Sequence, residues 1–179
     1  QQRWGVEDEG DVSDLLNVEF EKQDGAITLR QSGYIDKMVS THLPDGVSNY
    51  MQKNSVPAQS DLPQLVADAL SYRSEGDTPD AVPLKEYQAL VGALLYCAVN
   101  TRPDIAYAVG MLCRCMSCPT PALLDAARRV LSYLHRHRNV GLRYEAGSPR
   151  LEGMVDSDWA VKHSTTGFVF RMARAAVSW

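Results

Sequence analysis

The hydrophobic positions near the amino terminus follow the pattern of a β-hairpin. Two short apolar runs, residues 15–20 and 26–29, flank the polar tripeptide Gln23-Asp24-Gly25. An Asp-Gly pair supplies the positive φ angles that a tight hairpin turn needs. A helix should follow, with Ser32 as its cap. Its apolar stripe, at helical spacing, consists of Tyr34, Ile35, Met38 and Val39.

The pattern weakens over residues 44–86, which hold five of the nine prolines of the chain and many small polar residues. A structureless loop of that length is unusual in a compact domain. One helix is predicted inside it, with Asp61 as its cap. The apolar face of this helix holds Leu62, Leu65, Val66, Ala69 and Leu70. We interpret the remainder of the segment as a surface linker.

From residue 84 onward the apolar spacing is strongly helical. The first predicted helix has one face formed by Tyr87, Leu90, Val91, Leu94 and Leu95. Thr101 and Thr120 each stand one or two residues before a proline, which suits the cap and first turn of a second and a third helix. The second should cover residues 104–117, and the third should end at residues 139–141. The inward face of the third helix holds Leu123, Leu124, Ala127, Val130, Leu131 and Leu134.

The last part of the chain changes to a β pattern. Residues 142–144 form a short strand candidate, and three more strands are predicted over residues 151–155, 167–172 and 175–179. Strands at this spacing favour an antiparallel meander. The predicted fold class is therefore α+β: an amino-terminal β-hairpin, a middle of three to four helices, and a partial antiparallel sheet at the carboxyl end.

Composition and charge limit the classes of protein to which this chain can belong. Of 179 residues, 45% are hydrophobic and 22% charged, which is typical of a globular protein. The net charge of −4 argues against a protein that grips nucleic acid by itself, because phosphate contacts require a basic excess. The longest apolar stretch, residues 90–99, is half of the ~20 residues that span a bilayer, so we expect no transmembrane segment.

The amino terminus, Gln1-Gln2-Arg3-Trp4, has no apolar core of a signal peptide. We expect an intracellular protein. Because the first residue is not Met, we also expect a processed chain, a fragment or part of a longer protein.

The four cysteines allow two interpretations. Cys115 and Cys118 have the C-x2-C spacing of a zinc site, which Cys97, His135 and His137 could complete. Cys113 and Cys115, however, point to different faces of the predicted helix. We favour ordinary core cysteines and keep a zinc-binding module as the alternative.

Several short strings, in a fixed order, carry a family resemblance. They are YQALVGALLY (87–96), TRPDIAYAV (101–109), AARRVLSYL (126–134), GLRY (141–144), DSDWA (156–160), STTGFVF (164–170) and VSW (177–179). Together with residues 17–31 and Tyr34-Ile35, this series resembles the Pol polyprotein of copia-type long-terminal-repeat retrotransposons. The matching part is the end of the reverse transcriptase and the start of the ribonuclease H domain.

The resemblance implies four segments: residues 1–43 as the end of the palm and thumb, 44–83 as an insertion, 84–149 as a helical connection, and 150–179 as a truncated ribonuclease H-like domain. It implies a parent activity of RNA-directed DNA synthesis and RNA-strand cleavage, with an RNA–DNA hybrid as substrate and Mg²⁺ as cofactor. The family's location is the cytoplasm or nucleus, with an organelle left open.

Asp156 is the residue to which the resemblance assigns chemistry. It follows the predicted strand 151–155, where the ribonuclease H fold places its first metal-binding aspartate. The alternative is that Asp156 and Asp158 are solvated turn residues. Two-metal hydrolysis needs several carboxylates, and the family's Tyr-Val-Asp-Asp string and later ribonuclease H acids are not in this sequence. We therefore expect no catalysis by this chain and no bound Mg²⁺.

The sequence departs from the family pattern at several points. Leu124 stands where the family often has His, and residues 44–86 are longer than usual. Residues 161–163 shorten a Gly-Asp-rich loop, and the turn between Met172 and Ala175 lacks glycines. These departures suggest a decayed or trimmed element.

A cluster of basic residues includes Arg128, Arg129, Arg136 and Arg138. These side chains could contact the backbone of a nucleic-acid duplex. The alternative, which we favour, is the solvated face of an amphipathic helix. Trp159 and Trp179 could stack on bases, although packing is favoured for both. His163 could bind metal, although a loop histidine is more often solvated.

A function of another class stays open: a co-opted, non-catalytic structural or interaction subunit. Half of a ribonuclease H sheet leaves apolar side chains without cover. We expect Met154, Phe168, Phe170, Val177 and Trp179 to be exposed, and another protein to cover the sheet.

Overall fold

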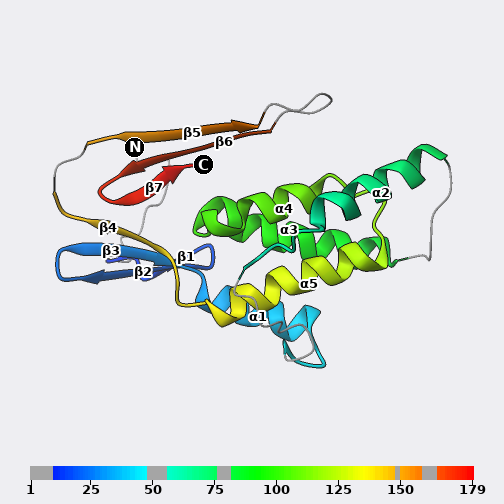
Figure 1. Cartoon of the computed structure of the whole chain (residues 1–179). Coiled ribbons are helices and arrows are strands. Elements are labelled where there is room, and N and C mark those ends of the chain that lie inside the picture. Colours follow the sequence, from blue (N-terminus) through cyan, green and yellow to red (C-terminus); the bar gives the residue numbers. More distant parts are fainter. Residues whose placement is uncertain (1–9, 48–55, 76–81, 148–149, 159–164) are drawn as a thin grey trace, which may run out of the picture.

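The chain folds into helices on one side and two sheets on the other (Figure 1). The computed structural model describes residues 10–47, 56–75, 82–147, 150–158 and 165–179. Within these ranges there are five α-helices, one short 3-10 helix, and antiparallel sheets of four and three strands. A mixture of helices and antiparallel sheets, as predicted, is thus confirmed.

The first sheet contains the predicted hairpin and one strand from far along the chain. Its order is β1 (Asp14–Leu15), β2 (Val18–Gln23), β3 (Ala26–Arg30) and β4 (Leu142–Glu145). The β2–β3 turn has φ angles of 51° at Asp24 and 73° at Gly25, which confirms the turn predicted from the Asp-Gly pair. Strand β4 follows all the helices in the sequence and pairs with β3, so that Leu142 lies opposite Leu29. The predicted segments 1–43 and 84–149 therefore share a sheet, and the fourfold division remains a prediction.

The helices form the larger core. They are α1 (Ser32–His42), α2 (Leu62–Glu75), α3 (Leu84–Asn100), α4 (Ala106–Cys113) and α5 (Pro121–Arg136), with the 3-10 helix η2 (Pro103–Ile105) before α4. Leu94 of α3 and Leu131 of α5 are fully buried, as their mid-stripe positions predict. The prediction was wrong for Leu95, which is 42% exposed because it lies at the edge of the α3 stripe. None of the described helices is long and apolar enough to cross a membrane.

Helix caps were predicted correctly at one of three threonine or serine positions. The hydroxyl of Thr120 accepts a hydrogen bond from the Leu123 N–H at 3.3 Å and begins α5. Ser32 is instead the first residue of α1, and its hydroxyl donates to the Arg138 carbonyl at 3.2 Å. Thr101 ends α3 rather than beginning a helix, and its hydroxyl donates to Gln31 Oε1 at 2.8 Å. The hydroxyls of Ser32 and Thr101 thus form hydrogen bonds to residues that are distant in the sequence.

The second sheet is the predicted antiparallel meander of β5 (Glu152–Asp158), β6 (Thr165–Met172) and β7 (Ala175–Ser178). It meets the first sheet along the β4–β7 edge. The Glu145 N–H donates to the Ala173 carbonyl at 3.0 Å, and the Tyr144 hydroxyl donates to the Ala176 carbonyl at 2.7 Å. The two sheets are therefore joined edge to edge through β4.

Candidate functional site

Asp156 lies inside β5 and not at the end of a strand. The predicted strand 151–155 was too short, since β5 continues to Asp158 and Asp156 pairs with Gly167 of β6. Alternation along a strand places Glu152, Met154 and Asp156 on one face of the sheet. The Asp156 side chain is exposed there.

A Mg²⁺ site at Asp156 stays a prediction. Glu152 is four residues away, about 13 Å along the strand, and the cross-strand neighbour Gly167 has no side chain. Among the described residues, no group of three His, Cys, Asp or Glu side chains is placed to hold a metal ion. Mg²⁺ requires near-octahedral oxygen ligands, and two-metal hydrolysis requires several carboxylates.

The opposite face of the second sheet is apolar and open. Val155 pairs directly with Phe168, and their side chains are 68% and 44% exposed. The Phe168 and Phe170 rings lie 5.8 Å apart between centroids. We call Val155, Phe168, Phe170 and Met172 the outer apolar face, since all four alternate to the same side and are exposed.

The predicted exposure of the terminal strands is correct for all but one residue. Met154, Phe168, Phe170 and Val177 are exposed. Trp179 is half-buried, because its indole Nε1 donates to the Ala98 carbonyl of α3 at 2.7 Å. Trp159 and His163, like residues 1–4, lie outside the described residues.

Two of the four predicted nucleic-acid contacts, Arg128 and Arg138, lie within salt-bridge distance of acids of the same chain. Arg128 pairs with Glu86 at 2.6 Å, and Arg138 approaches Asp36 at 3.8 Å. Arg136 is exposed and has no carboxylate partner within the part of the chain that the structure describes. Contact with nucleic acid through these arginines stays a prediction.

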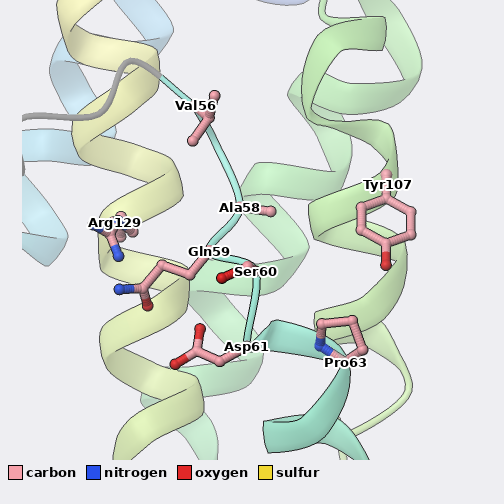
Figure 2. Close-up of a pocket in the computed structure, with 8 residues that line it drawn as sticks. All are labelled: Val56, Ala58, Gln59, Ser60, Asp61, Pro63, Tyr107 and Arg129. Atoms are coloured by element: carbon pink, nitrogen blue, oxygen red, sulfur yellow. The ribbon is translucent and has the colours of Figure 1, made fainter.

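Arg129 lines a pocket of about 620 Å³ together with a loop that precedes α2 (Figure 2). Burial lowers the pKa of Arg129, and the charge of Asp61 opposes that shift. Figure 2 shows Arg129 on α5 and Tyr107 on α4, with residues 56–61 running between them. Arg129 and Asp61 have opposite charges and both line the pocket. The charge of the pocket therefore favours neither an anionic nor a cationic ligand.

The cysteines are core residues by their burial. Cys97, Cys115 and Cys118 are buried, and burial raises the pKa of Cys97 and of Cys115 to about 12. Metal binding at these thiols would require the loss of that proton. The helix predicted over 104–117 ends at Cys113, because the following turn is tightened by i to i+3 bonds such as Cys115 N–H to the Leu112 carbonyl at 3.1 Å. This turn directs Cys115 and Cys118 inward.

An ionic cluster around the buried Arg102 could not be found from the sequence pattern. Arg102 is 1% exposed, and its guanidinium contacts both Asp104 oxygens and, through Nη1, the His137 carbonyl at 2.9 Å. The Tyr133 hydroxyl donates to Asp104 Oδ2 at 2.9 Å. The signal available in the sequence was an Arg-x-Asp spacing at the start of a helix.

Electrostatics fix the charge state of this cluster. Burial alone raises the pKa of Asp104, but hydrogen bonds and charge from Arg102, with the bond from Tyr133, outweigh it and hold the pKa below 3.8. Burial and the Asp104 contact raise the pKa of Tyr133. The TRPD string therefore forms a structural junction between α3 and the end of α5.

Comparison with known proteins gives transposon proteins among the relatives that match nearly the whole chain. The chain is 32% identical over 182 residues to a putative transposon Ty5-1 protein of Saccharomyces cerevisiae, covering 98% of the chain and 55% of that protein. It is 30% identical to a retrovirus-related Pol polyprotein from transposon RE1 of Arabidopsis thaliana, covering 99% of the chain and 12% of the polyprotein. The chain thus spans about half of the first relative and a small part of the second.

A third relative has a different name. The secreted RxLR effector protein 161 of Plasmopara viticola is 42% identical over 98 residues, which cover 52% of the chain and 69% of that protein. No family model matches the chain, and no solved structure matches it.

Proposed function

We propose that this chain, which belongs to the Pol polyproteins of copia-type retrotransposons, is the non-catalytic junction between reverse transcriptase and ribonuclease H. The observation that carries the proposal is the position of Asp156 on the first strand of a three-stranded antiparallel meander. The meander is joined through β4 to the sheet that contains the amino-terminal hairpin. In this proposal the substrate of the parent protein is an RNA–DNA hybrid.

Support for a structural role comes from the string TRPDIAYAV (101–109). Its arginine and aspartate are used internally, since Arg102 binds Asp104 and the His137 carbonyl. The basic residues Arg128 and Arg138 face carboxylates of the same chain. Arg102 and Arg128 join α3 to α5, and Arg138 approaches Asp36 of α1, so these charges are paired within the helical core.

The proposal has a direct metal-binding test. Mn²⁺, a paramagnetic substitute for Mg²⁺, is titrated into the chain while backbone NMR signals are followed. We expect weak, non-saturating broadening at exposed carboxylates, with the same profile in Asp156→Asn. A saturable site that broadens β5 and disappears in Asp156→Asn would contradict the proposal.

A second candidate is a co-opted interaction subunit that no longer serves replication. The outer apolar face favours it, because four exposed apolar side chains on one sheet face promote association. Solution mass and hydrogen exchange of the chain alone test this candidate. We expect self-association or binding to another protein, which would protect the amides of β6. A stable monomer with strongly protected β6 and β7 amides would contradict it.

A further inference from the structure

A second hollow lies between α4 and the terminal sheet and has a volume of about 520 Å³. One wall is a single face of the helix at spacings of three and four residues. It consists of Pro103, Ala106, Tyr107, Gly110, Met111 and Arg114. The other wall is residues 166–169 of β6, including Phe168 at the border of the outer apolar face, together with Trp179. This volume lies in the range of pockets that hold small organic ligands.

The walls of this α4 cleft are fixed by contacts outside it. Trp179 is held through its Nε1 bond to the Ala98 carbonyl at 2.7 Å. Val169 and Trp179 also pack on Ala175 and Ala176, which are buried. Val109, on the other side of α4, is fully buried in the helical core, so the cleft face of α4 cannot turn inward. The cleft is therefore preformed.

Arg114 is the basic residue among those that line the cleft. It is exposed, and its Nη1 donates to the Met111 sulfur at 3.8 Å. No residue that lines the cleft is acidic, and within the described ranges no carboxylate pairs with Arg114. An anionic group of a ligand would gain a charge-assisted hydrogen bond there.

We propose that the α4 cleft binds a small planar aromatic anion. Its ring lies against Tyr107 and Trp179, and its charged group faces Arg114. Aromatic side chains favour stacked or edge contacts with a planar ring, and a guanidinium favours a carboxylate, sulfonate or phosphate. The cleft shares β6 with the meander but uses neither Asp156 nor Arg102, so the two proposals can fail separately.

Gly110 supplies a variant that fills the cleft without disturbing the helix. A Cβ added at Gly110 meets no heavy atom within 4 Å, so a side chain there points into open space. Gly110→Phe should occupy the cleft. Gly92→Phe is the matched control, because Gly92 is also helical, exposed and open, but lies on α3 away from the cleft.

The probe is 8-anilinonaphthalene-1-sulfonate, a planar aromatic anion. In a Trp4→Phe, Trp159→Phe background, Trp179 is the single tryptophan, and energy transfer from it reports binding at the cleft. We expect one saturable site, about tenfold weaker binding in Arg114→Gln, and loss of transfer in Gly110→Phe. Circular dichroism checks that each variant keeps its fold.

Two further variants decide where the probe sits. Gly92→Phe and Phe170→Ser, the latter on the outer apolar face, should leave the energy transfer unchanged. Displacement by adenosine monophosphate would identify a nucleotide as the natural form of the anion, and no displacement would indicate a non-nucleotide aromatic acid. Absence of saturable transfer, or transfer that survives both Arg114→Gln and Gly110→Phe, would overturn the proposal.

Discussion

Both carboxylate oxygens of Asp104 accept hydrogen bonds from the guanidinium of Arg102, with Nε to Oδ1 at 2.9 Å and Nη2 to Oδ2 at 2.7 Å. The third guanidinium nitrogen reaches the His137 carbonyl just beyond α5. Arg102 thereby connects the end of α3 to the end of α5, from which the chain passes to β4. A fully buried guanidinium is stable only with such complete pairing.

Removing this guanidinium should destabilise the fold strongly. Arg102→Met leaves the His137 carbonyl without its donor and Asp104 with the Tyr133 hydroxyl alone, which should lower the free energy of unfolding by about 1.5–3 kcal/mol. Urea unfolding followed by circular dichroism measures the change. Arg136→Met is the control, because Arg136 is exposed and should shift stability by no more than about 0.5 kcal/mol. Equal effects of the two substitutions would mean that the cluster is not structural.

The depressed pKa of Asp104 should make part of the stability depend on pH. Because the folded-state pKa lies below the ordinary value of 3.8, the contribution is present above 3.8 and is lost as the pH falls through the folded value. Asp104→Asn lacks this contribution. Urea midpoints of the wild type and the variant should therefore differ most near neutral pH and converge in acid. A constant difference across that range would refute a role for the Asp104 charge.

The two central leucines should each contribute a large packing energy. Leu94→Ala and Leu131→Ala remove fully buried side chains and should lower the free energy of unfolding by about 2–5 kcal/mol, through lost transfer energy and a cavity. Leu95→Ala is the matched control on the same helix, since Leu95 is largely exposed. Thermal melts compare the three variants. A loss at Leu95 as large as at Leu94 would show that α3 is rotated.

The periodic parts of the fold could be predicted from the sequence. The α5 stripe around Leu131, the Asp24-Gly25 turn and the terminal meander follow from local spacing, because each is decided by residues close together in the chain. The role of Thr101 could not be predicted, since its partner is Gln31, 70 residues earlier. The Arg102 cluster was missed for the same reason, because it includes Tyr133 and the His137 carbonyl.

The candidate site, too, could be predicted from the sequence only in part, because it depends on residues that are distant along the chain. Asp156 could be located near a strand end from its string, but the true length of β5 depends on pairing with β6. The α4 cleft could not be predicted, because its walls come from segments about 60 residues apart. Trp179 was expected at an exposed edge, and only the position of α3 shows why it is half-buried.

Gly141 should be intolerant of any side chain. A Cβ there would lie 2.1 Å from the Leu29 carbonyl oxygen, which is backbone of the paired strand β3. Gly141→Ala should therefore force β4 away from β3 and lower the free energy of unfolding by about 1–3 kcal/mol. Gly110→Ala, in open space within α4, should instead raise it by up to about 1 kcal/mol. Denaturant melts distinguish the two, and a neutral Gly141→Ala would show that the β3–β4 approach is looser.

Hydrolysis of a labelled RNA–DNA hybrid tests the central claim most directly. The chain, Asp156→Asn and the matched variant Glu152→Gln, which removes a carboxylate on the same face of β5, are each incubated with hybrid and Mg²⁺ or Mn²⁺. A complete ribonuclease H serves as the positive control. A non-catalytic junction predicts intact hybrid in all three reactions. Cleavage that Glu152→Gln retains and Asp156→Asn loses would contradict it.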